Sequence, residues 1–386
     1  MKVPSGTLWL EDSAAQAVCR AVAARGASIY YVGGCVRDAI LGVTGGDVDF
    51  ASDARPEEVT RLVEEAGLKA VPTGIEHGTV TVVSAGKGFE VTTFRADVQT
   101  DGRRAVVQFS SDITEDAKRR DFTMNALYAT GDGQIVDPLG GLADCRARRV
   151  RFIDDAATRI REDYLRILRY FRFHAWISTP EAGFDPDALD AISANSDGLE
   201  TLSAERIGAE MRRLLAAPDP CRAIATMDQT GVLMRVLPGS DTSLLGPVVH
   251  LEAQLGLVAD VMLRLASLGG QDATERLRLS RADAQVLQAF LVHGYGAVPL
   301  AEVAYRQGVR IGLGAAILRA AMASQPLEPN THARLEKAAA ARFPVTAKDL
   351  MPELSGKALG DALRQMEQRW IASDFSLSRE DLMKAR

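Results

Sequence analysis

The sequence lacks the features that mark membrane-spanning, secreted and zinc-binding proteins. None of its apolar runs approaches the roughly 20 residues needed to cross a bilayer. The first residues, Met1 to Ser13, hold neither a basic nor an apolar segment of the kind that directs secretion. Only four cysteines are present, and no two are spaced as Cys-x-x-Cys, which argues against disulfides, structural zinc and redox motifs. We therefore expect a cytoplasmic protein that does not bind a membrane.

Histidine is scarce as well. The five histidines are spread along the chain and form no pair at the spacing of metal ligands. The second half of the chain has no His-Asp doublet that would indicate a phosphohydrolase. The remaining composition, with 47% hydrophobic and 25% charged residues, is that of an ordinary globular protein. At roughly 150 residues per domain, the 386 residues predict two or three domains.

Charge is distributed unevenly along the chain. The net charge of −6 argues against binding nucleic acid through bulk electrostatics. Residues 146–172 nevertheless contain nine arginines, no lysine and four acidic residues. A solvated helix face is the usual explanation of such a run. The exclusive use of arginine favours contacts with phosphates or base edges instead, because the guanidinium group presents a planar fork of donors.

The apolar periodicity divides the chain into a mixed first half and a helical second half. The patterns predict strands at 28–32, 47–52, 78–84, 89–94 and 148–153, and helices at 14–25, 36–41 and 56–66. Helical periodicity dominates the rest, with breaks at Pro218, Pro238 and Pro326. We predict an α+β fold with a mixed α/β head at 1–150, a helical neck at 151–215, and a helical body and tail at 216–386.

A glycine pair lies at a predicted junction between a strand and a helix. Gly33 and Gly34 follow the strand at 28–32, and Arg37 lies one turn into the helix. Backbone N–H groups at such a junction can approach a phosphate, and Arg37 can reach the same anion. Glycines also occur at such turns for steric reasons alone. The segment is therefore a candidate anion site, with a purely steric turn as the alternative.

Two carboxylates follow within the next predicted strand. Side chains alternate along a strand, so Asp47 and Asp49 would project from the same face. Two like charges so close together require a cation. Hard oxygen ligands beside a phosphate suit Mg²⁺, which in pairs clamps both oxygens of a nucleotidyl transfer. The alternative is a surface strand with two solvated aspartates.

A third cluster surrounds Arg120 and Asp121. These residues lie in a charged run, residues 118–121, that precedes an apolar anchor. The arginine could hold nucleotide phosphates while Asp121 completes a metal shell, with Glu90 as the rival third carboxylate. Equally, the run could be the capped start of a helix with a surface ion pair.

The fourth cluster recurs every three residues along a predicted helix. Its members are Asp163, Arg166, Arg169 and Arg172. Each step of three residues drifts about 60° around the helix axis, so these side chains form a spiral ridge. Asp163 and Arg166 could present one acceptor and one donor fork to a nucleobase edge. The alternative is a surface salt bridge worth less than about 1 kcal/mol.

Six motifs in a fixed order resemble one known family. They are VGGCVRD, DVDF, RRDFTMNA, DPLGG, EDYLRILR and LSAERI, and they span the first 210 residues or so. Together they resemble the class II tRNA nucleotidyltransferases, or CCA-adding enzymes, and their bacterial poly(A) polymerase relatives. The resemblance implies a nucleotidyltransferase head similar to polymerase β, a neck that carries a nucleobase-reading helix, and an RNA-binding body and tail.

The resemblance also implies roles for individual residues. Asp47 and Asp49 would bind catalytic Mg²⁺, with Asp121 as a further catalytic acid. Phosphate and sugar contacts would fall to Gly33, Gly34, Arg37 and Arg120. Asp163 and Arg166 would read the Watson–Crick edge of CTP or ATP, supported by Arg169 and Arg172. Residues 97–105 (DVQTDGRRA) resemble the flexible loop that CCA-adding members have and CC-adding members lack.

The implied reaction is addition of CCA to the 3′ end of tRNA from CTP and ATP, without an RNA template and with release of pyrophosphate. No obligate protein partner is inferred. A poly(A) polymerase, or an enzyme that adds only CC or only A, is the near alternative. A non-catalytic RNA-binding protein is the distant one, because such a protein should have lost the metal acids, and Asp47 and Asp49 are both present.

Overall fold

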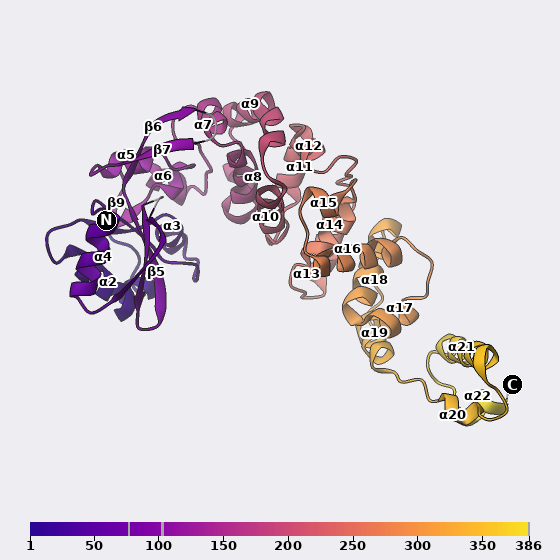
Figure 1. Cartoon of the computed structure of the whole chain (residues 1–386). Helices are drawn as coiled ribbons and strands as arrows, with labels where there is room; N and C mark the ends of the chain where they lie inside the picture. Colours follow the sequence, from indigo (N-terminus) through magenta and orange to yellow (C-terminus); the bar gives the residue numbers. More distant parts are fainter. Residues whose placement is uncertain (76–77, 102–103, 385–386) are drawn as a thin grey trace. The chain divides into compact units, whose positions relative to one another are not determined.

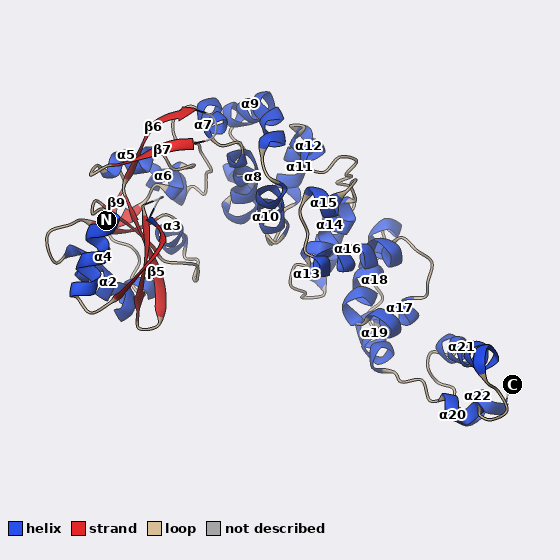
Figure 2. Cartoon of the chain, in the orientation of Figure 1, coloured by secondary structure: helices blue, strands red, loops and turns tan. Residues whose placement is uncertain are grey.

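The computed structural model describes residues 1–75, 78–101 and 104–384, with the backbone alone at 97–101 and 104–107. The chain forms two compact units, and Figure 1 labels their helices and strands. The N-terminal unit comprises residues 1–206 and 229–235, and the C-terminal unit comprises 207–228 and the residues from 236 onward. Strands lie in the N-terminal unit, and the described part of the C-terminal unit is built from helices (Figure 2). The predicted fold class, a mixed α/β head followed by helices, is confirmed.

A seven-stranded mixed sheet forms the head of the N-terminal unit. Its strand order is β3-β4-β5-β2-β1-β8-β9. The strands are β1 (Ile29–Val32), β2 (Asp49–Ser52), β3 (Lys69–Gly74), β4 (Thr79–Ser84), β5 (Lys87–Thr93), β8 (Tyr128–Ala129) and β9 (Ile135–Val136). Within this sheet β2 and β5 pair in parallel, whereas the other pairs are antiparallel. A separate hairpin joins β6 (Arg95–Asp101) to β7 (Arg104–Phe109).

Helices cover the sheet and continue the N-terminal unit. They are α1 (Leu8–Glu11), α2 (Ser13–Ala23), α3 (Gly34–Leu41), α4 (Pro56–Glu65), α5 (Ile113–Lys118), η2 (Thr123–Asn125), α6 (Gly141–Arg146), α7 (Ala156–Glu162), α8 (Leu165–Ile177), η3 (Pro180–Ala182), α9 (Pro186–Asn195) and η4 (Ser196–Thr201). Helix α4 starts with a proline and two glutamates in its first turn, which favour a helix N-terminus. Its buried stripe packs with α2 against β4.

The two faces of the sheet bury different cores. Tyr31 and Phe50 are register partners on β1 and β2, and their rings lie 4.6 Å apart on the face that α2 covers. Val32 and Tyr128 belong to the buried cluster on the opposite face. Because side chains alternate along a strand, one short strand, β1, contributes to both cores. The end of β1, where the glycine pair begins, is therefore packed on both faces.

Some predictions about local structure were wrong. Residues 69–74 were not predicted as a strand, yet they form the edge strand β3, a position where Pro72 is tolerated. Residues 148–153 do not form a strand, and Phe152 makes a single bridge to Phe122. The segment 97–105, which resembles a flexible loop of the family, pairs as the hairpin β6–β7 over its described backbone, and residues 102–103 lie outside the described residues. Two further differences, at the start of β2 and at Asp163, lie in the candidate active site.

The remaining elements are helical. They are α10 (Ala204–Leu215), α11 (Cys221–Gln229), α12 (Val232–Val236), α13 (Leu245–Gln254), α14 (Val261–Leu268), α15 (Ala273–Arg276), α16 (Arg281–Gly294), α17 (Leu300–Gln307), α18 (Val309–Ala323), α19 (Thr331–Ala340), α20 (Ala347–Leu350), α21 (Gly356–Ala372) and α22 (Arg379–Lys384). The breaks predicted at Pro218, Pro238 and Pro326 all fall between helices. Met366 and Trp370 of α21 are buried in a cluster with Val345 and Leu382.

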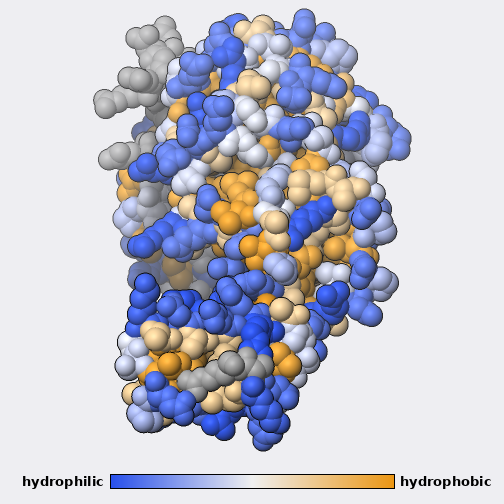
Figure 3. Space-filling view, turned by 90° about the vertical axis from the view of Figure 1, so that its right-hand side faces the viewer, coloured by the Kyte–Doolittle hydropathy of each residue, from blue (hydrophilic) through white to orange (hydrophobic). Residues whose placement is uncertain are grey.

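No helix in the described ranges is long and apolar enough to cross a membrane. On the face seen in Figure 3, hydrophobic residues form separate patches among hydrophilic ones. The division of the chain into head, neck, body and tail at the residue numbers given above stays a prediction.

Candidate active site

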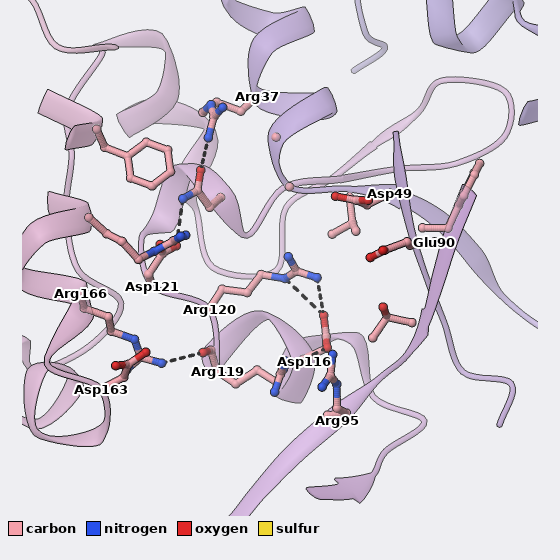
Figure 4. Close-up of a pocket in the computed structure, with 18 of the residues that line it drawn as sticks. Arg37, Asp49, Glu90, Arg95, Asp116, Arg119, Arg120, Asp121, Asp163 and Arg166 are labelled. Carbon is pink, nitrogen blue, oxygen red and sulfur yellow. Dashed lines mark hydrogen bonds and ion pairs between the residues drawn. The ribbon is translucent and has the colours of Figure 1, made fainter. Parts of the chain in front are cut away.

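A cavity of about 530 Å³ opens in the N-terminal unit beside the end of β1. Ten of the eleven predicted site residues line it: Gly33, Gly34, Arg37, Asp49, Arg120, Asp121, Asp163, Arg166, Arg169 and Arg172. Other residues in its wall include Glu90, Asp116, Arg119, Asn125 and Phe173. In Figure 4, Asp49 and Glu90 lie together, and Asp163 and Arg166 lie together on the other side of the view. The structure thus brings the separate sequence clusters into one cavity.

Strand register places the glycine turn beside the acids. Asp49 is the register partner of Val32 on β1 and of Glu90 on β5. Gly33 follows Val32 directly and has a φ of +71°, which favours glycine. A Cβ atom on Gly33 would lie 3.4 Å from Nη1 of Arg120. The turn therefore needs glycine for its backbone conformation and also leaves room for the guanidinium group of Arg120.

Negative charge concentrates at Asp49. Partial desolvation raises the pKa of Asp49 above its usual value, and the nearby charges of Glu90 and Asp47 raise it further, while Arg120 opposes them. Carboxylates that repel one another in this way are stabilised by a bound cation. Within the described ranges, no three acidic, histidine or cysteine side chains are gathered closely enough to form a complete metal site. The acids can hold an ion together with ligands that a substrate supplies.

The position of Asp47 differs from the prediction. Strand β2 begins at Asp49, and Asp47 lies in the exposed segment before it. Gly45 and Gly46, directly before Asp47, both have a φ of +100°, and strand pairing starts only at Asp49. The alternation of side chains along a strand therefore does not place the two aspartates on one face. Asp47 does not line the cavity, although its charge acts on Asp49.

A buried carboxylate holds Arg120. Nη2 of Arg120 donates to Oδ2 of Asp116 at 2.9 Å, and Nε donates to the Tyr128 hydroxyl at 3.1 Å. That hydroxyl in turn donates to Asp116 at 2.8 Å. Asp116 is 1% exposed and also pairs with Arg119 at 3.4 Å. Because Nε and Nη2 of Arg120 are held by these groups, Nη1 faces Gly33.

The ionisation of Asp116 should contribute to the pH dependence of stability. Burial opposes ionisation, but the charge of Arg120, the Tyr128 hydroxyl and Arg119 hold the pKa of Asp116 below its usual value. A carboxyl group with a lowered folded-state pKa stabilises the fold above its unfolded pKa of about 3.9, and this contribution is lost as the pH falls below that value. We expect the difference in unfolding free energy between the parent and Asp116→Asn to shrink on acidification. Urea unfolding at pH values on both sides of 3.9 measures it, and parallel pH profiles would contradict the expectation.

Asp121 is engaged with Arg169. Oδ2 of Asp121 accepts from Nε of Arg169 at 2.7 Å and from Nη2 at 2.5 Å. Oδ1 accepts from the Asn125 amide at 2.9 Å and from the backbone N–H of Phe122 at 2.8 Å. Burial opposes ionisation here too, but Arg169 and these hydrogen bonds keep the pKa of Asp121 below its usual value. Both oxygens therefore already accept hydrogen bonds.

The side chains of Asp163 and Arg166 lie in the same cavity and hydrogen-bond to other residues. Asp163 was expected on the helix, but its backbone is extended between α7 and α8. Its carboxylate accepts from the backbone N–H of Leu165 at 3.1 Å and from Arg206 at 2.8 Å. Arg166 donates to Glu162 at 2.6 Å and to the carbonyl of Arg119 at 3.1 Å. The alternative of a surface salt bridge between Asp163 and Arg166 is therefore wrong: each side chain is bound by a different residue.

The arginines of α8 are not a solvated face. Arg166 has a side-chain exposure of 13%, and Arg169 one of 31%. The guanidinium carbons of Arg37, Arg169 and Arg172 lie 5.1, 5.4 and 4.3 Å from the centroid of the Phe173 ring. Two helices, α3 and α8, thus direct positive charge around one aromatic ring. Such a group of cations suits an anionic ligand.

Sequence reasoning gave no role to three residues that organise the site. They are Asp116, Asn125 and Glu162. Each lies within or beside a motif used above, but their partners are arginines that the motifs singled out for ligand contacts. The motifs place acidic residues three or four positions from several of these arginines, and that spacing on a helix indicates that some of the acids orient arginines. Glu90, considered only as a rival third acid, lies directly beside Asp49.

Models of two protein families match this chain. "Poly A polymerase head domain" matches residues 29–151, and "Probable RNA and SrmB- binding site of polymerase A" matches residues 183–244. The mitochondrial CCA tRNA nucleotidyltransferase 1 of Danio rerio is 32% identical over 91% of this chain and 85% of its own length. The chain belongs to the CCA-adding enzyme family. The CCA-adding enzyme of Geobacillus thermodenitrificans is 33% identical over 92% of this chain and 88% of its own.

Solved CCA-adding enzymes share the fold. The Bacillus stearothermophilus enzyme in complex with CTP matches with a TM-score of 0.75 at 28% identity, over 96% of each chain. The Thermotoga maritima CCA-adding enzyme complexed with tRNA_CCA matches with a TM-score of 0.69 at 18% identity, over 96% of this chain and 93% of that one. As a member of the CCA-adding enzyme family, this chain is an RNA 3′-end nucleotidyltransferase, and the family implies a divalent metal ion.

Proposed function

We propose that this chain adds C, C and A in turn to the 3′ end of tRNA from CTP and ATP. The observation that supports the proposal most is a single cavity with two kinds of chemistry. One wall holds an acidic pair beside a glycine turn, and the other wall holds a carboxylate and a guanidinium group fixed by their neighbours. The relatives named as CCA-adding enzymes support the same reaction.

The acidic pair would hold Mg²⁺ in this proposal. The register of Asp49 and Glu90 and the raised pKa of Asp49 fit a cation bound between hard oxygen ligands. Asp47, close enough to raise that pKa, would add a further oxygen. When bound, the ion would lower the pKa of the RNA 3′-hydroxyl and neutralise charge on the phosphates. Because the protein's own acids are few, nucleotide phosphates would supply the remaining ligands.

The positive groups would hold the triphosphate and the sugar. Arg120 presents Nη1 to the glycine turn, and the backbone of Gly33 and Gly34 can approach a phosphate there. Arg37, Arg169 and Arg172 surround Phe173 nearby and would support the nucleotide. The 3′-hydroxyl oxygen then forms a bond to the α-phosphorus as the bond to the bridging oxygen of the β-phosphate breaks. Pyrophosphate leaves with that bridging oxygen, and the hydroxyl proton passes to solvent.

Asp163 and Arg166 would select the base. Cytosine and adenine each present an amino donor next to a ring nitrogen acceptor on the Watson–Crick edge, whereas uracil and guanine present a carbonyl acceptor next to an N–H donor. A carboxylate matches the amino group, and a guanidinium group matches the ring nitrogen. Arg206 holds Asp163, while Glu162 and a backbone carbonyl hold Arg166. A protein pair of this kind replaces a nucleic-acid template.

The test uses a tRNA that ends before its 3′ CCA. It is incubated with Mg²⁺ and CTP alone, ATP alone, or both, and the products are resolved at single-nucleotide length. We expect two additions with CTP alone and three with both nucleotides. A long ladder with ATP alone would support the poly(A) polymerase alternative, and a stop after two additions with both nucleotides would support a CC-adding enzyme. Absence of extension under every condition, with tRNA still bound, would support the non-catalytic alternative.

We infer that Glu90 is a better candidate than Asp121 for the third acid. Because Asp121 already accepts hydrogen bonds on both oxygens, we expect Asp121→Asn to raise the KM for CTP and ATP more than it lowers kcat. Glu90→Gln should lower kcat with a smaller change in KM, since an ion ligand acts on the transition state. Steady-state kinetics at saturating tRNA separate the two. The reverse pattern would assign the third acid to Asp121.

The proposed partners are the tRNA 3′ end, CTP and ATP. A cytoplasmic location stays a prediction, and the curated relatives include proteins named as mitochondrial.

A further inference from the structure

One buried amide in the cavity wall connects two arginines that come from different helices. Asn125 ends the short helix η2 and is 6% exposed. Its Oδ1 accepts from Nη1 of Arg37 at 2.6 Å, and its Nδ2 donates to Oδ1 of Asp121 at 2.9 Å. These two partners determine the orientation of the amide, because only its oxygen can accept from Arg37 and only its nitrogen can donate to a carboxylate.

Each partner of Asn125 continues the chain of hydrogen bonds. Arg37 also donates to the carboxylate of Asp38, at 2.8 and 3.0 Å. The second oxygen of Asp121 accepts from Nε of Arg169 at 2.7 Å. A continuous path therefore runs from α3 through Asn125 and Asp121 to α8, and the dashed lines of Figure 4 trace it between Arg37 and Asp121.

This path joins groups that would otherwise repel each other. The guanidinium carbons of Arg37 and Arg169 lie 5.1 and 5.4 Å from the centroid of the Phe173 ring. The neutral amide of Asn125 directs its oxygen towards Arg37 and its nitrogen towards Asp121, the carboxylate that binds Arg169. Arg37 and Asp121 both gain a hydrogen-bond partner in this way. An aspartate at 125 would face Asp121 with a like charge, and an apolar residue would leave Arg37 and Asp121 each without one partner.

We propose that Asn125 is a positioning residue that couples Arg37 to Arg169. Asn125 sets the distance between α3, whose Arg37 would contact the phosphates, and α8, whose Arg166 would contact the base. The inference rests on the proposed function, since it assigns both arginines to the nucleotide. Phosphates and sugar are common to CTP and ATP, so the coupling acts equally on both nucleotides and leaves the choice of base to Asp163 and Arg166.

The experiment measures binding of CTP and of ATP to the full chain by calorimetry, without RNA. Asn125→Leu is expected to raise the Kd for both nucleotides by a similar factor of about ten or more, because two hydrogen bonds to charged groups are lost. Arg37→Lys and Arg169→Lys are then combined, in the parent and in Asn125→Leu. The two lysine substitutions should be non-additive in the parent and additive in the Asn125→Leu background.

Thr123→Val is the matched control. Thr123 lies in the same helix η2, is also buried, and donates a hydrogen bond to Asp144 at 2.8 Å instead of to a cavity residue. We expect its nucleotide affinities to stay within about two-fold of the parent, because only a side-chain hydrogen bond outside the path is lost.

The outcomes separate the coupling from the proposed function. A parent chain that binds neither CTP nor ATP would overturn the proposed function and the coupling with it. A parent that binds both, with Asn125→Leu binding them equally well, would overturn the coupling alone. The coupling would also be overturned if Thr123→Val lost as much affinity as Asn125→Leu. It would likewise be overturned if the two lysine substitutions remained non-additive in Asn125→Leu, because Arg37 and Arg169 would then be coupled without Asn125.

Discussion

Replacing Asp49 by asparagine is expected to lower kcat for nucleotide addition by at least about 10³-fold, equivalent to about 4 kcal/mol in the transition state. Asp49 stands at the start of β2, between the end of β1 and Glu90. Asparagine keeps the size of the side chain but removes the negative charge, which is what an ion bound there requires. Burial and the nearby charges of Glu90 and Asp47 raise the pKa of Asp49, so the folded chain disfavours its charged form. The fold should therefore tolerate the substitution well.

The control for this prediction lies at the other end of the same strand. Asp53 directly follows β2, and its carboxylate accepts a hydrogen bond from the backbone N–H of Ser28 at 2.7 Å. Asp53→Asn keeps an acceptor for that hydrogen bond and lies outside the cavity lining. We expect nearly parental kcat from it. Single-turnover addition of one C at saturating Mg²⁺ and CTP measures both variants. An Asp49→Asn enzyme within ten-fold of the parent would contradict an ion site at the sheet edge.

The second large effect concerns stability of the C-terminal unit. Replacing Glu252 by alanine should lower the unfolding free energy by about 3–5 kcal/mol, because it leaves a buried charge without its partner. Glu252 is 2% exposed and accepts from Nε of Arg264 at 2.7 Å. Arg264, 3% exposed, also donates to the carbonyls of Leu215 and Ala217 at 2.7 and 2.5 Å. These carbonyls lie at and after the end of α10, so the pair secures a helix terminus.

An exposed ion pair in the same unit provides the comparison. Glu302 and Arg306 form a pair at 2.9 Å on α17, with side-chain exposures of 26% and 40%. Glu302→Ala should change the unfolding free energy by less than about 1 kcal/mol, as is usual for pairs in contact with solvent. Urea unfolding followed by far-UV circular dichroism measures both variants. Equal effects of Glu252→Ala and Glu302→Ala would contradict the role given to the buried pair.

Local motifs predicted much of the site because its main parts are short segments. The glycine turn, the acid at position 49, and Arg120 each follow from a few neighbouring residues, and ten of the eleven predicted residues line the cavity. The head's secondary structure was predictable for the same reason, since a strand such as β1 and a helix such as α4 have clear apolar patterns.

Pairings between distant segments could not be predicted from such patterns. Glu90 lies beside Asp49 only because β5 pairs in parallel with β2, across a helix and a hairpin. Asp121 accepts a hydrogen bond from Arg169, a residue 48 positions later, and no local pattern predicts this contact. The prediction for Asp47 was wrong because strand pairing starts only at Asp49, and side chains alternate regularly only within a strand.

The most direct test of the central claim is the sequence of what the chain adds when all four nucleotides are available. A tRNA that ends before its CCA is incubated with Mg²⁺ and equal concentrations of ATP, CTP, GTP and UTP, and the new 3′ ends are sequenced. If Asp163 and Arg166 choose the base without a template, the products end in CCA and grow no further. Tails of adenosine alone, incorporation of U or G at these positions, or no addition at all would contradict the account.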